Sequence, residues 1–149
     1  MTTIACDKNS IACDLQFTYG GSIKFKGTTK ILTVKPKLAR EMFGIEKAHI
    51  GFCGNAEQWA NIVAWFASPD DKMPKLKDME LLMLTDTHEI YHATTMQNWL
   101  KIDEPFFAIG SGCHLAIAAM SSGKSPKEAI AVASKFDPST GMGCKVYKV

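Results

Sequence analysis

Two short stretches of the 149-residue sequence combine residue types that could hydrolyse a covalent bond. Between His88 and His92 the chain reads H-E-I-Y-H, which matches the H-E-x-x-H pattern of zinc hydrolases. The sequence opens Met1-Thr2, and we expect Met1 to be removed because Thr2 is small. A threonine with a free α-amine combines a hydroxyl nucleophile with an amine base whose pKa is about 7.7–8.0. The surrounding elements decide which stretch has the geometry for chemistry.

The elements predicted around H-E-I-Y-H disfavour a zinc site. A zinc hydrolase of this kind needs both histidines on one helical face, with the glutamate between them as general base. Residues 79–86 (MELLMLTD) and 89–95 (EIYHATT) instead have the composition of two strands joined by a turn. On a strand, His88 and His92 share one face and Glu89 points to the other. We therefore expect two partly exposed hairpin histidines and keep a zinc hydrolase as the weakest alternative.

The remaining patterns predict an α+β protein. Besides the hairpin, the segments with strand patterns are 2–7, 10–17, 22–27, 30–35, 48–54, 106–112 and 144–149. The segments with helical patterns are 55–68, 114–123 and 125–136, with one further helical turn expected within 37–47. Because strands and helices each cluster along the chain, we expect antiparallel sheets covered by helices.

Two of the helices carry specific signals. The apolar stripe expected on the first of them comprises Ala56, Trp59, Ala60, Val63 and Phe66. The helix at 125–136 begins with Ser125 as N-cap, Pro126 at the first helical position and Glu128 as the capping-box partner. This combination makes it the helix most firmly predicted from local sequence.

Composition excludes several classes of protein. Hydrophobic residues make up 46% of the chain, which favours a single globular domain over residues 1–149. The 17 basic and 15 acidic residues leave a net charge of +2, too balanced to indicate binding to nucleic acid or a membrane surface. The five cysteines show no C-x-x-C spacing, and the start of the chain has no apolar signal region. We therefore expect free thiols and a cytoplasmic location, in a bacterium or in the host of a bacterial virus.

Several blocks of the sequence, taken in order, resemble the proteasome β-subunit family, and most closely its bacterial HslV branch. The blocks are TTIACD, IACDLQ, KGTTKI, GFCGNAEQW, FFAIGSG and FDPSTGMGCKVYKV. The T-T-I start and the A-I-G-S-G strand end are shared with that branch, and the resemblance spans nearly the whole chain. It implies an N-terminal nucleophile (Ntn) hydrolase with a four-layer αββα sandwich of two antiparallel sheets, in agreement with the order of elements predicted above.

The resemblance also implies a nucleophile and its activating groups. Thr2 Oγ would be the nucleophile, and its freed α-amine, through a water, the general base. Asp14 matches the family aspartate near the end of the second strand, and Lys30 matches the lysine beside the nucleophile. A lysine ammonium there would lower the pKa of the amine and hydroxyl, while Asp14 would keep the lysine charged and oriented.

Further roles follow from the same resemblance. The backbone N–H of Gly54 would stabilise the developing oxyanion. Ser111, in G-S-G, matches a serine near the threonine amine. Asp137 and Thr140, in D-P-S-T-G, match the aspartate and hydroxyl of a D-x-x-S-G pattern, with threonine replacing serine.

A substrate groove is implied next to these residues. Phe52 and Thr18 would line it by analogy, so we expect tolerance for an apolar side chain before the cut bond. Asn55 and Ala56 would form part of its floor, where the G-G-T/A-A-D stretch of the family is changed to Gly54-Asn55-Ala56-Glu57.

The chain also departs from the family in length. Between Phe66 and Leu81 it has only a short polar stretch, where the HslV branch has a second long outer helix. Conversely, the stretch at 35–47 (KPKLAREMFGIEK) is longer than the corresponding connection. Because the outer helix belongs to the face used for assembly, the ring size and the identity of any unfoldase partner stay open.

The sequence thus predicts a threonine endopeptidase that acts on peptides or unfolded proteins in a homo-oligomeric ring. A separate AAA+ ATPase could control access, since this chain has no G-x-x-x-x-G-K-[ST] motif. No cofactor is expected, although a structural monovalent or divalent cation near the C-terminal turn stays open. The alternative is a catalytically inactive structural or interaction protein with the same fold.

Overall fold

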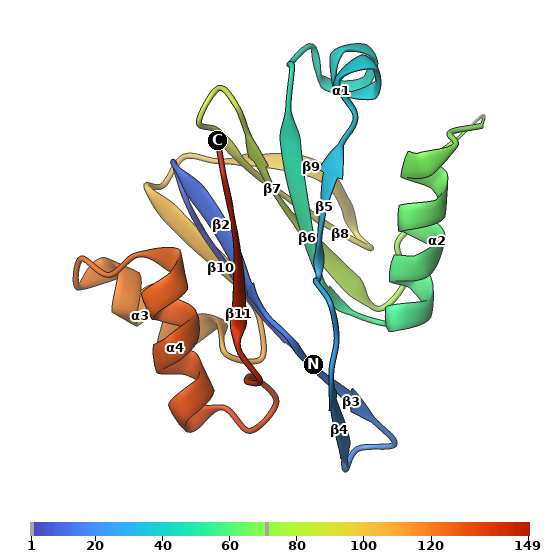
Figure 1. The fold of residues 1–149 in the computed structure, drawn as a ribbon. Coiled ribbons are helices and arrows are strands. Elements are labelled where there is room, and N and C mark those ends of the chain that lie inside the picture. Colours follow the sequence, from blue (N-terminus) through green and yellow to red (C-terminus); the bar gives the residue numbers. More distant parts are fainter. Residues whose placement is uncertain (1, 71) are drawn as a thin grey trace.

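Two antiparallel sheets face each other and form the middle of the molecule (Figure 1). The structure, a computed structural model, describes residues 2–70 and 72–149. In spatial order, the strands of the first sheet are β10 (Phe106–Gly110), β1 (Thr3–Asp7), β2 (Ser10–Asp14) and β11 (Cys144–Lys148). Those of the second are β5 (Ile31–Val34), β6 (Ala48–Gly54), β7 (Met79–Thr85), β8 (Ile90–Thr94) and β9 (Gln97–Ile102). Two further strands, β3 (Gln16–Tyr19) and β4 (Ile23–Lys26), form a separate hairpin.

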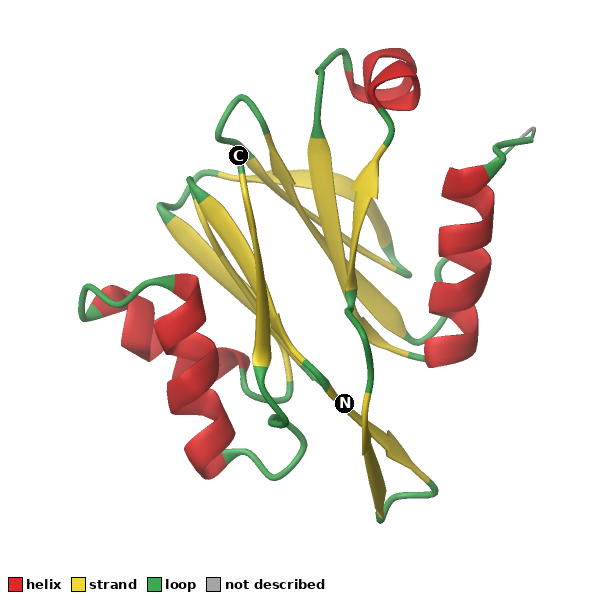
Figure 2. Cartoon of the chain, viewed as in Figure 1, coloured by secondary structure: helices red, strands yellow, loops and turns green. Residues whose placement is uncertain are grey.

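Helices cover the outer faces of both sheets (Figure 2). The helices are α1 (Pro36–Phe43), α2 (Ala56–Ala67), α3 (Cys113–Ser121) and α4 (Pro126–Phe136). The pair α3 and α4 packs on the four-stranded sheet, while α2 packs on the five-stranded sheet. The expected α+β class and the four-layer αββα sandwich are therefore confirmed.

The alternation of side chains along β1 explains why the layers stack in this way. Ile4 and Cys6 point into the hydrophobic core between the two sheets. Ala5 points to the other face and, with Ala12 and Ala108 of the neighbouring strands, lies under α3 and α4. These small side chains let the two helices approach the sheet closely, so that all three alanines are buried.

Most predicted elements are confirmed, and the helix at 125–136 has the predicted capping box. Ser125 Oγ accepts a hydrogen bond from Glu128 N–H at 3.2 Å, and Glu128 Oε1 accepts one from Ser125 N–H at 3.0 Å. The single turn expected within 37–47 was too short, because α1 has two turns and ends at Gly44 in the left-handed conformation. The strand β9 was missed altogether, because the alternation of QNWLKI is weak without its neighbour β8.

The expected apolar stripe of α2 was partly wrong. Trp59 and Phe66 are buried as predicted, whereas Ile62, which was not in the stripe, is fully buried. The other three predicted positions, Ala56, Ala60 and Val63, are exposed. The face of α2 that packs on the sheet is therefore centred nearer to Ile62 than the apolar periodicity of the sequence indicated.

After α2 the chain returns to the sheet without a second outer helix. The described residues of this connection, 68–70 and 72–78, contain no helix. The expected loss of that element is therefore confirmed for the described part of the connection.

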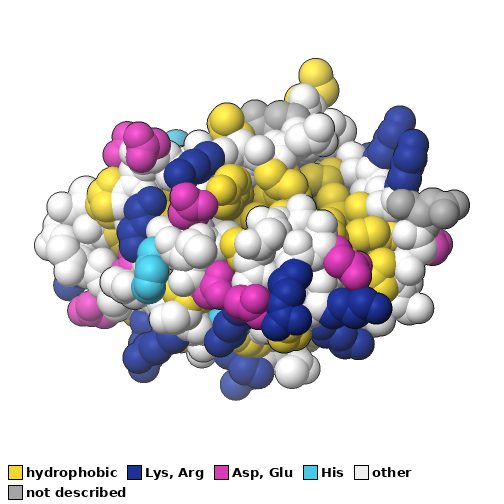
Figure 3. All heavy atoms as spheres, turned by 90° about the horizontal axis from the view of Figure 1, so that it is seen from above, with side chains coloured by type: hydrophobic (Ala, Val, Ile, Leu, Met, Phe, Trp, Pro, Cys, Tyr) yellow, Lys and Arg dark blue, Asp and Glu magenta, His cyan; other side chains and the backbone are white. Residues whose placement is uncertain are grey.

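The charge pattern of the surface agrees with the balanced composition. On the face drawn in Figure 3, basic and acidic side chains are interspersed. No helix within the described residues has the length and apolar character that crossing a bilayer requires.

Candidate active site

Thr2 lies just before β1 and is held by the turn that follows β10. Ser111 N–H donates to Thr2 O at 2.8 Å, and Thr2 as a whole is 3% exposed. Gly110 has φ +97°, and a Cβ at this position would lie 1.8 Å from Thr2 O. Glycine is therefore required here, because any side chain would push the Thr2 main chain out of place. Met1, whose removal was predicted, lies outside the described residues.

The structure brings the side chains of three predicted site residues, Thr2, Asp14 and Lys30, together in one buried cluster. Lys30 Nζ lies 2.9 Å from Asp14 Oδ1 and also donates to Thr2 Oγ1 and to the carbonyl of Gln16. These three acceptors satisfy the three ammonium protons. Thr2 Oγ1 in turn donates to Asp14 Oδ1. The threonine oxygen thus lies between a cation and an anion.

Asp14 is the anchor of this cluster. Its side chain is fully buried, and its carboxylate accepts hydrogen bonds from the backbone N–H groups of Thr3 (3.2 Å), Gln16 (3.3 Å) and Gly141 (3.0 Å). These backbone donors, together with Lys30, hold the carboxylate in one orientation.

Two opposing effects act on Lys30. Burial lowers the pKa of its ammonium, while the charge and hydrogen bond of Asp14 raise it, and the net shift is downward. The ring of Phe17 adds a cation–π contact, with Lys30 Nζ 4.8 Å from the ring centroid. The lysine therefore provides a local positive field at Thr2 Oγ1 without access to bulk water.

A second hydrogen-bonded cluster contacts the Thr2 main chain through Ser111, whose N–H donates to Thr2 O. Asp137 Oδ2 accepts hydrogen bonds from Ser111 Oγ and Thr140 Oγ1, both at 2.5 Å. Burial raises the pKa of Asp137, but the hydrogen bonds from Ser111, Thr140 and the Ser139 N–H outweigh it and leave the pKa below its ordinary value. Thr3 Oγ1 completes the cluster 2.7 Å from Thr140 Oγ1. Sequence reasoning missed Thr3, although its position next to Thr2 was a signal.

The predicted groove residues line one cavity of about 260 Å³ that opens beside Thr2. Thr18, Phe52, Asn55 and Ala56 all belong to its wall, together with Gly54. Gln16 and Phe17 also line it and were not predicted. The signal that could have found them is their place in the chain, directly between the predicted site residue Asp14 and the predicted groove residue Thr18.

Aromatic rings form the apolar part of this wall. The Phe52 ring stacks on Trp59 at 4.4 Å between centroids, and Phe17 lies 6.5 Å from Phe52. Thr18 Oγ1 is buried and has no hydrogen-bond partner. The cavity therefore combines an aromatic surface with one unused hydroxyl.

Gly54 lines this cavity and cannot carry a side chain without strain. Its φ is +115°, and a Cβ there would lie 2.3 Å from Asp78 O. The thiol of Cys53, the residue before Gly54, is unsuited to act as a nucleophile, because burial raises its pKa to about 12.

The H-E-I-Y-H stretch does not form the helical face that a zinc hydrolase requires. His88 lies in the turn after β7 with φ +62°, and its Nδ1 lies 2.7 Å from Lys8 O. His92 lies on β8, where its Nε2 lies 2.8 Å from Glu80 Oε2. The hairpin interpretation is confirmed. Within residues 2–70 and 72–149, no group of three or more potential metal ligands occurs, near the C-terminal turn or elsewhere.

The fold is that of the Ntn hydrolases, with proteasome-like and HslV-like proteins as structural neighbours. BPH from Thiobacillus denitrificans superimposes with a TM-score of 0.74 at 16% identity, over 99% of this chain and 96% of that one. HslV from Trypanosoma brucei gives 0.68 at 18% identity, over 98% of both chains. An Anbu mutant from Hyphomicrobium sp. strain MC1 gives 0.75 at 10% identity, over 100% and 82%. No family model and no curated protein sequence matches the chain.

Proposed function

We propose that this protein is a threonine endopeptidase with Thr2 as its N-terminal nucleophile after removal of Met1. The observation that carries the proposal is the contact of Thr2 Oγ1 with both Lys30 Nζ and Asp14 Oδ1 in a buried cluster beside an open cavity. A scaffold protein has no need for a buried lysine aimed at a hydroxyl, because a buried charge is costly to maintain.

In the acylation half-reaction the Thr2 hydroxyl attacks the carbonyl carbon of the substrate. Its proton passes, through a water, to the α-amine of the same residue. Lys30 stabilises the developing alkoxide, and the Gly54 N–H stabilises the oxyanion on the substrate. The C–N bond then breaks, and the amine returns the proton to the leaving nitrogen.

Deacylation repeats these steps with water in place of the threonine hydroxyl. Water attacks the ester carbonyl and gives a proton to the α-amine, and that proton returns to Thr2 Oγ as the ester bond breaks. Ser111 and Asp137, through their hydrogen bonds near the Thr2 main chain, orient the amine for both half-reactions.

Comparison with the neighbours supports this reaction, because one of them binds the inhibitor epoxomicin. The epoxomicin complex of Thiobacillus denitrificans BPH superimposes with a TM-score of 0.73 at 17% identity. We expect the present chain to assemble into a homo-oligomeric ring in the cytoplasm, with peptides or unfolded proteins as substrates and an AAA+ ATPase as a separate partner.

A second candidate function is an inactive member of the same fold class that serves in assembly. The observation that favours it is the helix-free connection between α2 and β7, described above, which alters an outer face. The intact triad of Thr2, Asp14 and Lys30 weighs against it.

The intact mass of the purified protein after incubation with a peptide epoxyketone tests the proposal. This reagent needs both the hydroxyl and the free amine of an N-terminal threonine. We expect a mass that lacks Met1 and carries one inhibitor, with no adduct on Thr2→Ala. Retention of Met1 without an adduct would support the inactive alternative.

A further inference from the structure

A second cavity, of about 540 Å³, meets the first one at Gly54. It is bounded by the ends of β6 and β10, the start of β7 and the turn between β8 and β9. Ser111, whose N–H bonds to Thr2 O, belongs to its wall. The second cavity therefore reaches Ser111, the residue that holds the main chain of Thr2, whereas Thr2 and Lys30 themselves line the first cavity.

The proposed chemistry determines which part of a substrate each cavity receives. The α-amine of Thr2 must hand its proton to the nitrogen that leaves, so the leaving segment lies on the main-chain side of Thr2. That is the side of Ser111 and the second cavity. The segment that becomes the ester then extends toward the aromatic cavity of Phe17 and Phe52.

The second cavity has a distinct charge. Two acidic residues, Asp78 and Glu80, belong to its wall, and no Lys, Arg or His occurs among the described residues that line it. The Glu80 side chain is 43% exposed. The hydrogen bond with His92 lowers the pKa of Glu80, which keeps the carboxylate ionised at neutral pH. Met79 and Met96 add flexible apolar surface suited to a long aliphatic stem.

We propose that this cavity binds the residue that follows the cut bond and that Asp78 and Glu80 make it select lysine or arginine there. The inference rests on the proposed endopeptidase function and deepens it, because it names a class of substrate. The aliphatic stem of the substrate residue lies along the methionines, and its charged end reaches the carboxylates.

Internally quenched peptides that differ only in the residue after the cut bond test this selectivity. The probes carry lysine or glutamate at that position and share one aromatic residue before it. We expect kcat/KM for the lysine peptide to be about tenfold higher than for the glutamate peptide, because attraction and repulsion by two carboxylates both contribute. The ratio should shrink as the salt concentration rises, since the groups are reached by solvent.

Variants assign the selectivity to this cavity. In the double variant Asp78→Asn with Glu80→Gln, we expect the lysine-to-glutamate ratio to fall close to one. Asn suits position 78 because, like Asp, it tolerates the φ of +53° found there. The matched control, Asp103→Asn with Glu41→Gln, removes the same two charges from exposed sites outside both cavities and should retain the wild-type ratio.

The possible outcomes separate this inference from the proposed function. Cleavage of both peptides at equal rates, or a preference that survives in the double variant, would overturn the inference and leave the endopeptidase intact. No cleavage together with no epoxyketone adduct on Thr2 would overturn the proposed function, and the inference would fall with it.

Discussion

Lys30 Nζ lies 2.9 Å from Asp14 Oδ1, and neither side chain is more than 2% exposed. The two charges come from different layers of the fold, because Asp14 ends a strand of one sheet and Lys30 directly precedes the first strand of the other. The pair therefore links the two sheets at the point where Thr2 Oγ1 lies. Under the proposed function, the stability of the fold and the reactivity of Thr2 depend on the same contact.

Replacing either member of this pair should destabilise the protein strongly. Lys30→Met leaves the Asp14 carboxylate buried without its cation, and we expect the free energy of unfolding to fall by about 3–5 kcal/mol. The double variant with Asp14→Asn should recover part of that loss, because no charge remains unpaired. Urea unfolding measures both, and peptide hydrolysis should stay abolished in each variant. The Asp14→Asn single variant completes the comparison. If the free energies lost in the two single variants simply add up to the loss in the double variant, a direct coupling of the two residues is contradicted.

Ser111→Ala should impair catalysis more than folding. The change removes one of the hydrogen bonds that hold Asp137 and orient the Thr2 main chain, so we expect kcat to fall about tenfold or more with little change in KM. The pKa of Asp137 should rise at the same time, since Ser111 is a cause of its low value. Steady-state kinetics and NMR titration measure the two effects. Ser121→Ala removes a hydroxyl from an exposed helix position and serves as the control.

Gly54→Ala should be costlier than the same change at another glycine with positive φ. At Gly54 the new Cβ would meet the Asp78 carbonyl at 2.3 Å, whereas Gly20, with φ +59°, has open space around it. At Gly20 we expect only the cost of a left-handed alanine, about 1–2 kcal/mol. At Gly54 a strained backbone of about 1–3 kcal/mol adds to the steric clash with the Asp78 carbonyl. Urea midpoints compare the two variants. Only Gly54→Ala should also abolish hydrolysis, and an active Gly54→Ala enzyme would count against its role at the oxyanion.

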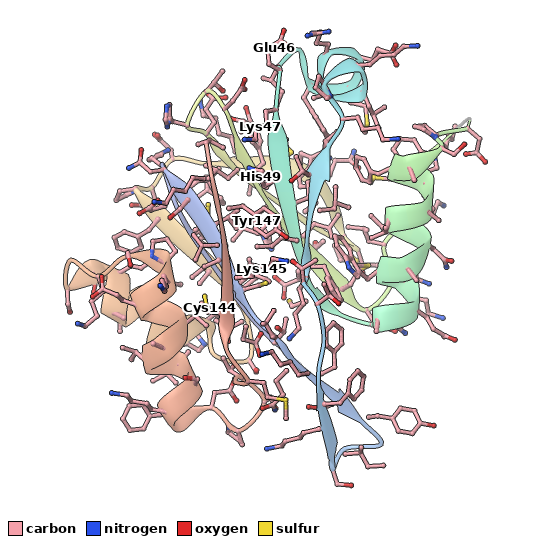
Figure 4. The ribbon with its side chains drawn as sticks, viewed as in Figure 1. Glu46, Lys47, His49, Cys144, Lys145 and Tyr147 are labelled. Atoms are coloured by element: carbon pink, nitrogen blue, oxygen red, sulfur yellow. The ribbon has the colours of Figure 1, made fainter. Side chains whose placement is uncertain are left out.

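His49 should make stability depend on pH in the weakly acidic range. The side chain lies between β6 and β11, where its Nδ1 is 2.8 Å from Thr33 Oγ1 and its Nε2 is 3.1 Å from Lys148 O (Figure 4). Tyr147 packs on the imidazole with 5.3 Å between ring centroids. Burial lowers the pKa of His49 in the folded state, an effect that the Lys148 carbonyl opposes and the Lys47 charge reinforces.

The sign of this effect follows from proton linkage. The unfolded chain binds a proton near the ordinary pKa of about 6.5, before the folded chain does. The free energy of unfolding should therefore decrease as pH falls from about 6.5 toward the folded-state pKa. His49→Gln keeps polar atoms at the site but does not titrate, so its unfolding free energy should change less over pH 5–7. Identical pH profiles for both proteins would show that His49 is not the responsible group.

The aromatic cavity should govern the residue before the cut bond. Substrates with a large apolar side chain there should be hydrolysed faster than those with a charged one, because Phe17 and Phe52 supply the wall. Phe17→Ala should reduce this preference about tenfold, since it removes one of two rings. Peptide libraries varied at that position measure the preference, and a preference for charged residues in the native enzyme would contradict the assignment.

Local sequence was sufficient for elements whose signals are short-range. The helix α4 was predictable because Ser125, Pro126 and Glu128 satisfy its first turn from within the turn itself. The antiparallel strands followed from alternation, and the hairpin around His88 from the turn residues before it. The resemblance to the proteasome β-subunit family singled out Thr2, Asp14 and Lys30 together, and the structure places them in contact across 12 and 16 positions of sequence.

Other features depended on contacts that no local pattern contains. Strand β9 forms because β8 offers it an edge, and the buried face of α2 turns toward Ile62 because of the sheet beneath it. Thr3 joins Thr140 across 137 positions of sequence. The second cavity is formed by residues at the ends of strands from both sheets, which are distant from one another in the sequence. The sequence by itself thus determined which residues could react, while tertiary packing decided which surfaces surround them, because those surfaces are built from residues distant in the chain.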